Sequence, residues 1–172
     1  MSDDLTIRAL AAELSKKTST SWVTYDGSTH AVWHTWLDDA LLLVSGGDEQ
    51  PLPDVPDGAT VEVTQRSKDN GGRLLTWAGR AEVVRPDDEA WGPVTAVLVR
   101  DRLNLADLAT AADHWAAHST VRRVVPTGAT TESPGDLSDD AHRAEPPESN
   151  ATTRGPLPRV LHKRVRRRPR LS

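Results

Sequence analysis

The sequence contains no cysteine, and this absence excludes several kinds of chemistry. Without thiols the chain has no disulfide framework, no thiolate metal centre and no cysteine nucleophile. No apolar run approaches the roughly 20 residues that span a bilayer. The first residues, Met1-Ser-Asp-Asp4, are acidic and lack the basic and apolar regions of a signal peptide. These features predict a cytoplasmic protein without a membrane span.

Phenylalanine is also absent, whereas the chain has six tryptophans, all between Trp22 and Trp115. The last apolar run, Val121–Val125, ends at a Pro-Thr-Gly turn, and the residues that follow are rich in proline, serine and acid. Such a segment buries too little apolar surface to offset its ordering entropy. We therefore predict one domain over residues 1–128 and a disordered tail over 129–172. A tail helix packed on the domain is the alternative, which the recurring prolines disfavour.

The charge is divided unevenly along the chain, although the net value is only −4. Residues 1–153 hold all 25 acids, whereas residues 154–172 hold eight Lys and Arg and no acid. This basic segment could bind nucleic acid or anionic lipid without specificity, through counterion release. It could also contact the acidic domain, or have no selected role. Nucleic-acid contact through residues 154–170 is thus one of three open interpretations.

Hydrophobic periodicity and turn signals predict a mainly β fold, a six-stranded antiparallel barrel with flanking helices. No βαβ unit appears before residue 86, which argues against a parallel sheet. The predicted strands are 21–25, 30–37, 40–45, 59–66, 73–85 and 120–125. The predicted helices are 5–16, a segment after Pro86 with Trp91, Val94 and Leu98 on one face, and 106–118.

Most catalytic signatures are missing from the chain. It has no GxSxG elbow, no Walker loop and no GxGxxG fingerprint. His114 and His118 have the spacing of a metalloprotease pair, but the intervening Trp-Ala-Ala lacks the general-base glutamate. We interpret them as surface histidines and predict no metal site.

The segment His30–Trp36 is the first candidate for ligand binding. Period-two alternation places His30, Val32, His34 and Trp36 on one face of a strand, with Trp33 on the other. A face of indole and imidazole rings could stack on a flat heteroaromatic ligand. A barrel core that uses tryptophan in place of phenylalanine is the alternative.

Two glycine-containing turns are further candidates for binding an anion. Ser45-Gly-Gly-Asp-Glu-Gln50 could offer backbone N–H groups to a phosphate, or could be a plain turn in which the two acids repel anions. Arg66-Ser-Lys-Asp-Asn-Gly-Gly-Arg73 places three cations around a hairpin tip. These cations could hold a phosphate, or could simply solvate the hairpin.

The ordered set of these patterns over residues 5–127 resembles the pyridoxamine 5′-phosphate oxidase-like, FMN-binding split β-barrel family, in particular a short actinobacterial subgroup. The patterns that carry the resemblance are Ser21-Trp-Val-Thr-Tyr-Asp-Gly27, Val32-Trp-His-Thr-Trp36, Leu42-Leu-Val-Ser-Gly-Gly-Asp-Glu-Gln-Pro-Leu52, Val61–Leu74 and Trp77-Ala-Gly-Arg-Ala-Glu-Val-Val84.

This resemblance implies a six-stranded split barrel that forms a homodimer, with a flavin at the dimer interface. It implies FMN, or the deazaflavin F420 of a related branch, as cofactor of an oxidoreductase-like protein of unassigned substrate and catalytic residues. By the same resemblance, ring and ribityl contacts are expected from Trp33, His34, Ser45, Gly46 and Gly47. The residues expected to hold the phosphate are Lys68 and Arg73.

One departure from the family pattern leaves a second function open. Tight FMN binders usually carry a cation just past the third strand, where this chain has Asp48 and Glu49. A lost charge-assisted contact of about 1.5 to 3 kcal/mol weakens affinity at least tenfold. The alternative is therefore a non-catalytic split-barrel dimer that acts as a binding or interaction module.

Overall fold

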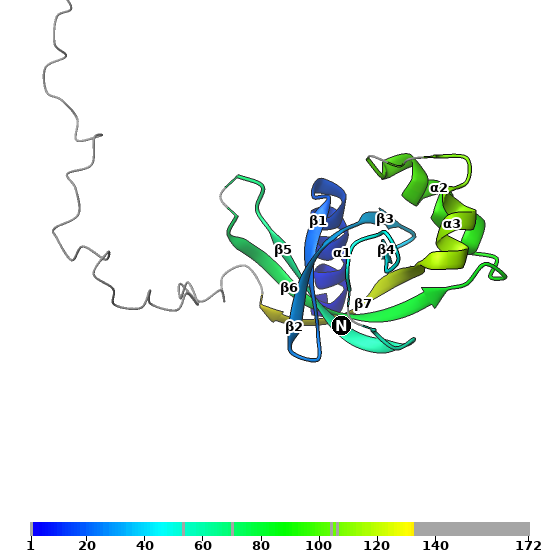
Figure 1. Ribbon diagram of the computed structural model, residues 1–172. Helices are drawn as coiled ribbons and strands as arrows, with labels where there is room; N and C mark the ends of the chain where they lie inside the picture. The colour runs from blue at the N-terminus through cyan, green and yellow to red at the C-terminus, as the bar shows by residue number, and fades with distance from the viewer. Residues whose placement is uncertain (1, 53, 70, 104, 106, 133–172) are drawn as a thin grey trace, which may run out of the picture. The chain divides into compact units, whose positions relative to one another are not determined.

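The computed structural model describes residues 2–132, apart from 53, 70, 104 and 106 (Figure 1). Within these residues the chain forms three helices and seven strands. Their order is α1 (Ser2–Lys17), β1 (Thr20–Tyr25), β2 (Ser28–Trp33), β3 (Thr35–Leu37), β4 (Ala40–Ser45), β5 (Ala59–Arg66), β6 (Arg73–Val84), α2 (Trp91–Asp101), α3 (Ala111–His118) and β7 (Thr120–Glu132). The predicted tail from residue 133 onward lies outside the described residues.

The seven strands form one antiparallel sheet in the order β2-β1-β5-β6-β7-β4-β3. Its two edge strands, β2 and β3, are consecutive in the chain and are separated only by His34. Because one residue joins the two ends of the strand order, the sheet curls until its edges approach each other. Figure 1 shows this curled sheet with α1 in its hollow and with α2 and α3 together on one side.

The prediction of a single strand over residues 30–37 is therefore wrong, and the sheet has seven strands rather than six. The break has a local cause in the hydrogen bonds of Trp33 and His34. The backbone of Trp33 bonds to the side-chain amide of Gln50, and the His34 N–H donates to the Ser19 carbonyl at 3.1 Å. These partners lie outside the edge ladders, so the segment changes from pairing with β1 to pairing with β4.

One face of the curled sheet packs around α1. Leu41 and Leu43 of β4 are fully buried there, in the same core as Ile7 and Ala11 of the helix. Trp77 of β6 belongs to this core and is also fully buried. Full burial of a leucine side chain contributes roughly 1.5 to 3 kcal/mol. This core fixes the C-terminal end of α1 at the seam between β2 and β3, where the histidine lies.

The other face of β4 packs against the remaining two helices. Leu42 and Val44 are buried with Leu98 of α2 and Trp115 of α3. Both faces of β4 are thus covered, which explains why its sequence is a continuous apolar run rather than an alternating one.

Two predicted boundaries require correction. The helix predicted over 106–118 begins only at Ala111, because the Asp107 carboxylate accepts hydrogen bonds from the Ala109 N–H and the Thr110 hydroxyl and forms a turn there. The last strand runs to Glu132, beyond the predicted domain end at 128, because its final residues pair with Thr76 and Trp77 of β6. Residues 129–132 therefore do not belong to a disordered tail.

No helix in the described part of the chain has the length and apolar character needed to cross a membrane.

Candidate functional site

A cleft of about 280 Å³ opens at the seam of the sheet, where α1 ends. The cleft combines two indole rings, an imidazole, hydroxyl groups and a lysine, and its lining residues are Ser15, Lys16, Thr18, Ser19, Trp33, His34, Thr35, Trp36 and Asp101. Two of the predicted ring-binding residues, Trp33 and His34, thus line the same cleft, and Trp36 lies beside them.

His34 is the buried imidazole of this cleft, with 2% of its surface exposed. Its Nε2 lies 3.3 Å from the Ser15 carbonyl oxygen, which only accepts, so Nε2 carries the proton in the neutral ring. Burial lowers the pKa of His34 to about 4, although the backbone carbonyls of Ser15 and Val32 oppose the shift. The side chain is therefore neutral at pH 7 and holds the end of α1 against the seam.

One wall of the cleft is fixed by contacts between β3 and α2. The Thr35 hydroxyl donates to Asp101 at 2.6 Å, and Arg100 pairs with the same carboxylate. Hydrogen bonding to Arg100 lowers the pKa of Asp101, and the Thr35 hydroxyl also lowers it. The acid of this cleft is thus already neutralised by neighbouring side chains.

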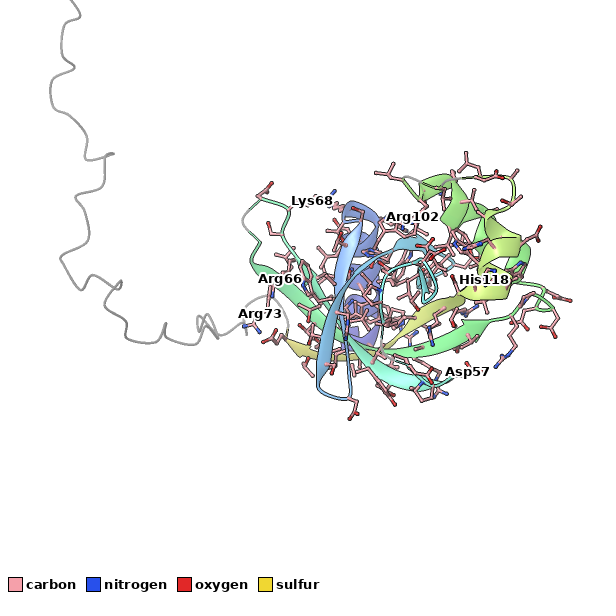
Figure 2. The ribbon with its side chains drawn as sticks, in the orientation of Figure 1. Asp57, Arg66, Lys68, Arg73, Arg102 and His118 are labelled. Atoms are coloured by element: carbon pink, nitrogen blue, oxygen red, sulfur yellow. The ribbon has the colours of Figure 1, made fainter. Side chains whose placement is uncertain are left out.

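A second cleft, of about 200 Å³, adjoins the first. It lies between the start of β1 and the β5–β6 hairpin and is lined by Thr18, Ser19, Thr20, Trp22, Arg66, Ser67, Lys68 and Gly71. Thr18 and Ser19 line both clefts, so the two are neighbours along the α1–β1 connection. Figure 2 shows Arg66 and Lys68 on the hairpin, apart from Arg102 and His118 on the helical side of the domain.

The two predicted phosphate residues differ in their surroundings. Lys68 lines the second cleft and makes no ion pair with any described carboxylate. Arg73 donates to Glu132 of β7 at 2.7 Å and lines neither cleft. The structure therefore leaves Lys68 accessible to an anion and commits Arg73 to an internal pair.

The loop after β4 is bound to the end of β2 through Gln50. The Gln50 amide donates to the carbonyls of Trp33 at 2.8 Å and Val44 at 3.0 Å. On the helical side, the Arg102 guanidinium lies over the Trp33 indole at 5.3 Å from the ring centre. One face of Trp33 is thus covered by an internal cation–π contact.

Glu49 lies where the family resemblance leads one to expect a phosphate-binding cation. In the structure it has a structural role instead. Its side chain is 8% exposed and accepts hydrogen bonds from Arg102 and from the Trp115 indole, each at 2.9 Å. The carboxylate holds α2 and α3 to this loop. Its charge is therefore compensated within the domain.

Ser45 and Gly46 are bound to neighbouring segments by hydrogen bonds. The Ser45 hydroxyl accepts from Arg122, the Gly46 N–H donates to the Gln50 carbonyl, and the Gly46 carbonyl accepts from Ser119. These contacts favour the interpretation of this segment as a plain turn, since its first N–H is already used.

Arg122 is a buried cation that the sequence analysis did not single out. Its side chain is 7% exposed and donates to Ser45 and to the Val55 carbonyl, and burial lowers its pKa. Asp54, at 3.9 Å, is its nearest carboxylate among the described residues. The sequence did contain a signal for the burial of Arg122. It lies two residues before Val124, and strand alternation places the two side chains on the same inward face.

Gly47 provides a test of this turn. Its φ is +61°, and a Cβ there would lie 2.5 Å from the His118 carbonyl oxygen. Gly47→Ala should lower the free energy of unfolding by about 2 to 3 kcal/mol through backbone strain and overpacking. Gly46→Ala, with φ +82° and no atom within 4 Å, is the matched control and should lose about 1 kcal/mol. Equal midpoints in urea for the two variants would contradict this packing.

His114 of α3 lines a separate cleft of about 310 Å³ between the Asp48–Glu49 loop and the helices. The rings of His114 and His118 lie 4.8 Å apart, and His114 is 3.7 Å from the exposed Asp48. Among the described residues, no three side chains of metal-binding type gather together.

Comparisons with known proteins show which solved structures have a similar fold. No family model and no curated protein matches the chain. Among solved structures, the heme storage protein HutZ of Vibrio cholerae is similar with a TM-score of 0.51 at 14% identity, over 70% of this chain and 89% of that one. An FAD-binding protein of Mycobacterium smegmatis has a TM-score of 0.45 at 19% identity, over 69% and 89%. A candidate pyridoxamine 5′-phosphate oxidase of Listeria innocua has 0.44 at 19%, over 70% and 93%.

The curled antiparallel sheet with flanking helices defines this chain as a β-barrel protein of the split-barrel type. The likeness to HutZ, at a TM-score of 0.51, supports this fold, so the split-barrel fold that the sequence resemblance implied is confirmed at the level of the fold.

Proposed function

We propose that this chain binds a flavin-type cofactor, FMN or F420, and acts as an oxidoreductase-like protein. The observation that carries the proposal is the pair of adjacent clefts joined at Thr18 and Ser19. One is lined by indole and imidazole rings, and the other contains cations. A flavin mononucleotide has the matching division between a flat heteroaromatic ring and an anionic end. A cytoplasmic homodimer, as expected from the sequence, is part of the proposal.

The side chains of the first cleft suit a flat ring. Trp33 and Trp36 offer aromatic surface, and the neutral His34 introduces no charge beneath the ring. When bound, a flavin or deazaflavin supplies hydride transfer, and the protein contributes position and electrostatics. The internal pairing of Asp101 leaves Lys16 as the cleft's uncompensated charge among the described residues, which favours an electron-rich ligand.

A non-catalytic binding or interaction module is the second candidate. It is favoured by the Arg102 guanidinium, which covers Trp33, and by Glu49, which stands where the family's cation is expected. In this case the barrel is a dimer scaffold and the clefts bind no redox cofactor. Nucleic-acid contact through residues 154–170 would belong to this candidate, and it remains a prediction for a segment outside the described residues.

Ligand fluorescence separates the two candidates. We expect the full chain to quench FMN or F420 emission with micromolar affinity, and Trp33→Leu to weaken that binding at least tenfold by removing an aromatic wall. Trp91→Leu is the matched control, because this half-buried tryptophan of α2 lines neither cleft. Haemin is titrated in parallel because HutZ is named as a heme storage protein. No quenching of either flavin would overturn the cofactor proposal in favour of the second candidate.

A further inference from the structure

The second cleft differs from the rest of the surface in its uncompensated positive charge. Four cations of the described residues make no ion pair with a described carboxylate, namely Lys16, Arg66, Lys68 and Arg80. Three of these four line the two adjacent clefts, and Arg66 and Lys68 line the same one. Cations without partners gather here although acids outnumber bases along the chain as a whole.

Arg66 is held in place by Trp22 rather than by an acid. Its guanidinium carbon lies 4.6 Å from the centre of the Trp22 ring, and its Nε is buried without a hydrogen-bond partner among the described residues. Trp22 is paired with Thr64 across the β1–β5 ladder, so Arg66 is its diagonal neighbour. A cation stacked on an indole keeps its N–H edge free for an anion, because stacking uses the face and hydrogen bonds use the edge.

The hairpin geometry brings Lys68 to the same cleft. The ladder is irregular between Gln65 and Arg66, and the Ser67 N–H donates to the Gly72 carbonyl at 2.8 Å. This closes a tight loop that carries Lys68 beside Ser67 and Gly71. Asp69 follows Lys68 on the loop, but it makes no described ion pair with either cation and does not line the cleft.

Hydroxyl groups complete the polar lining. The Thr18 hydroxyl donates to the Leu14 carbonyl, and His34 lies within hydrogen-bond distance of the Ser15 carbonyl. The Leu14 and Ser15 carbonyls in the last turn of α1 thus have partners, which reduces their repulsion of an anion at this helix end. The hydroxyls of Ser19 and Thr20 have no side-chain partner among the described residues and remain available as donors.

We infer that Arg66 and Lys68 form a phosphate subsite between β1 and the β5–β6 hairpin, with Trp22 as the platform for Arg66. The inference rests on the proposed function, because the phosphate would belong to a ligand whose ring occupies the neighbouring cleft. Two other candidates for the phosphate are less suitable than this subsite. Arg73 is paired with Glu132. In the Gly46–Gly47 turn, Gly47 lies against the His118 carbonyl of α3, and two acids follow. A monophosphate on a flavin or a free phosphate presents the same chemistry to these two cations.

The test compares FMN with riboflavin, which lacks the phosphate, on the full chain. We expect FMN to bind at least tenfold more tightly, since charge-assisted contacts carry the difference. Lys68→Gln and Arg66→Gln should each reduce this preference severalfold while leaving riboflavin affinity unchanged. Arg80→Gln is the matched control, because Arg80 is exposed and unpaired but lines neither cleft. Equal affinities for FMN and riboflavin would overturn the subsite and leave the cofactor proposal intact.

Inorganic pyrophosphate tests the subsite without a flavin. We expect it to change tryptophan emission in the wild type, and to change it much less in Arg66→Gln or Lys68→Gln. If neither flavin binds, the proposed function fails, and this titration alone then decides the subsite. A pyrophosphate response that persists in both variants, or no response in the wild type, would overturn the inference.

Discussion

Glu49→Ala is expected to lower the free energy of unfolding by about 3 kcal/mol, because it leaves a buried indole N–H and a partly buried guanidinium without their acceptor. Arg102, whose side chain is 28% exposed, would lose its carboxylate, and the Trp115 indole N–H would lose its only described acceptor. The substitution also releases the loop after β4 from α2 and α3. Urea unfolding followed by far-ultraviolet circular dichroism measures the change.

The neighbouring acid is the control for Glu49. Asp48 is 93% exposed, so Asp48→Ala should change stability by less than about 0.5 kcal/mol. Glu49→Gln should lie between the two, because an amide oxygen still accepts one of the hydrogen bonds but carries no charge. If Glu49→Ala is as stable as Asp48→Ala, this carboxylate does not hold the helices, and the acids here must be explained by function.

Lowering the pH from 6.5 toward 4.5 should destabilise the domain through the buried imidazole of His34. The pKa of His34 is lowered to about 4 in the folded chain, against 6.5 for an ordinary histidine. Above pH 6.5 the ring is neutral in both states and has no effect on the equilibrium. As the pH falls from 6.5 toward 4, the unfolded chain binds a proton that the folded chain does not, so stability decreases. The expected loss between pH 6.5 and 4.5 is about 2 to 3 kcal/mol.

The measurement is the unfolding free energy at several pH values for the wild type, His34→Gln and His114→Gln. Asp57, Asp101 and Asp107, whose pKa values are lowered by hydrogen bonds, lose their stabilising effect only at lower pH and fall outside this window. His34→Gln should abolish most of the slope, whatever its stability at neutral pH. His114→Gln, on the exposed side of α3, should keep it. An unchanged slope in His34→Gln would contradict the buried neutral imidazole.

Local signals in the sequence predicted much of the strand framework. The Asp26-Gly27 turn, the continuous apolar run of β4 and the alternation of Val61 and Val63 each determine structure over a few residues. The break at His34 was not predicted, because the alternation of apolar residues continues through it. Whether a strand pairs with β1 or β4 depends on sheet closure, which is a long-range property.

The site was predicted in part for the same reason. Trp33, His34 and Lys68 line the two clefts, and their residue types alone suggested binding. The internal roles of Glu49 and Arg73 depend on Trp115 and Glu132, which lie 66 and 59 residues further along the chain. No local pattern reports such contacts. The unpaired state of Arg66 is likewise visible only once the ion pairs of the domain are known.

The indole N–H signals of the six tryptophans offer the most direct test of the proposal that the two adjacent clefts bind a flavin-type cofactor. In a proton–nitrogen correlation spectrum each indole gives its own signal, which can be assigned by single substitutions. On titration with FMN, we predict that the signals of Trp22, Trp33 and Trp36 shift together, because these rings line the two clefts. The signals of Trp77, Trp91 and Trp115 should stay in place, since these rings line neither cleft. No shift at saturating FMN, or shifts confined to Trp91 and Trp115, would contradict the assignment of these clefts to a flavin-type cofactor.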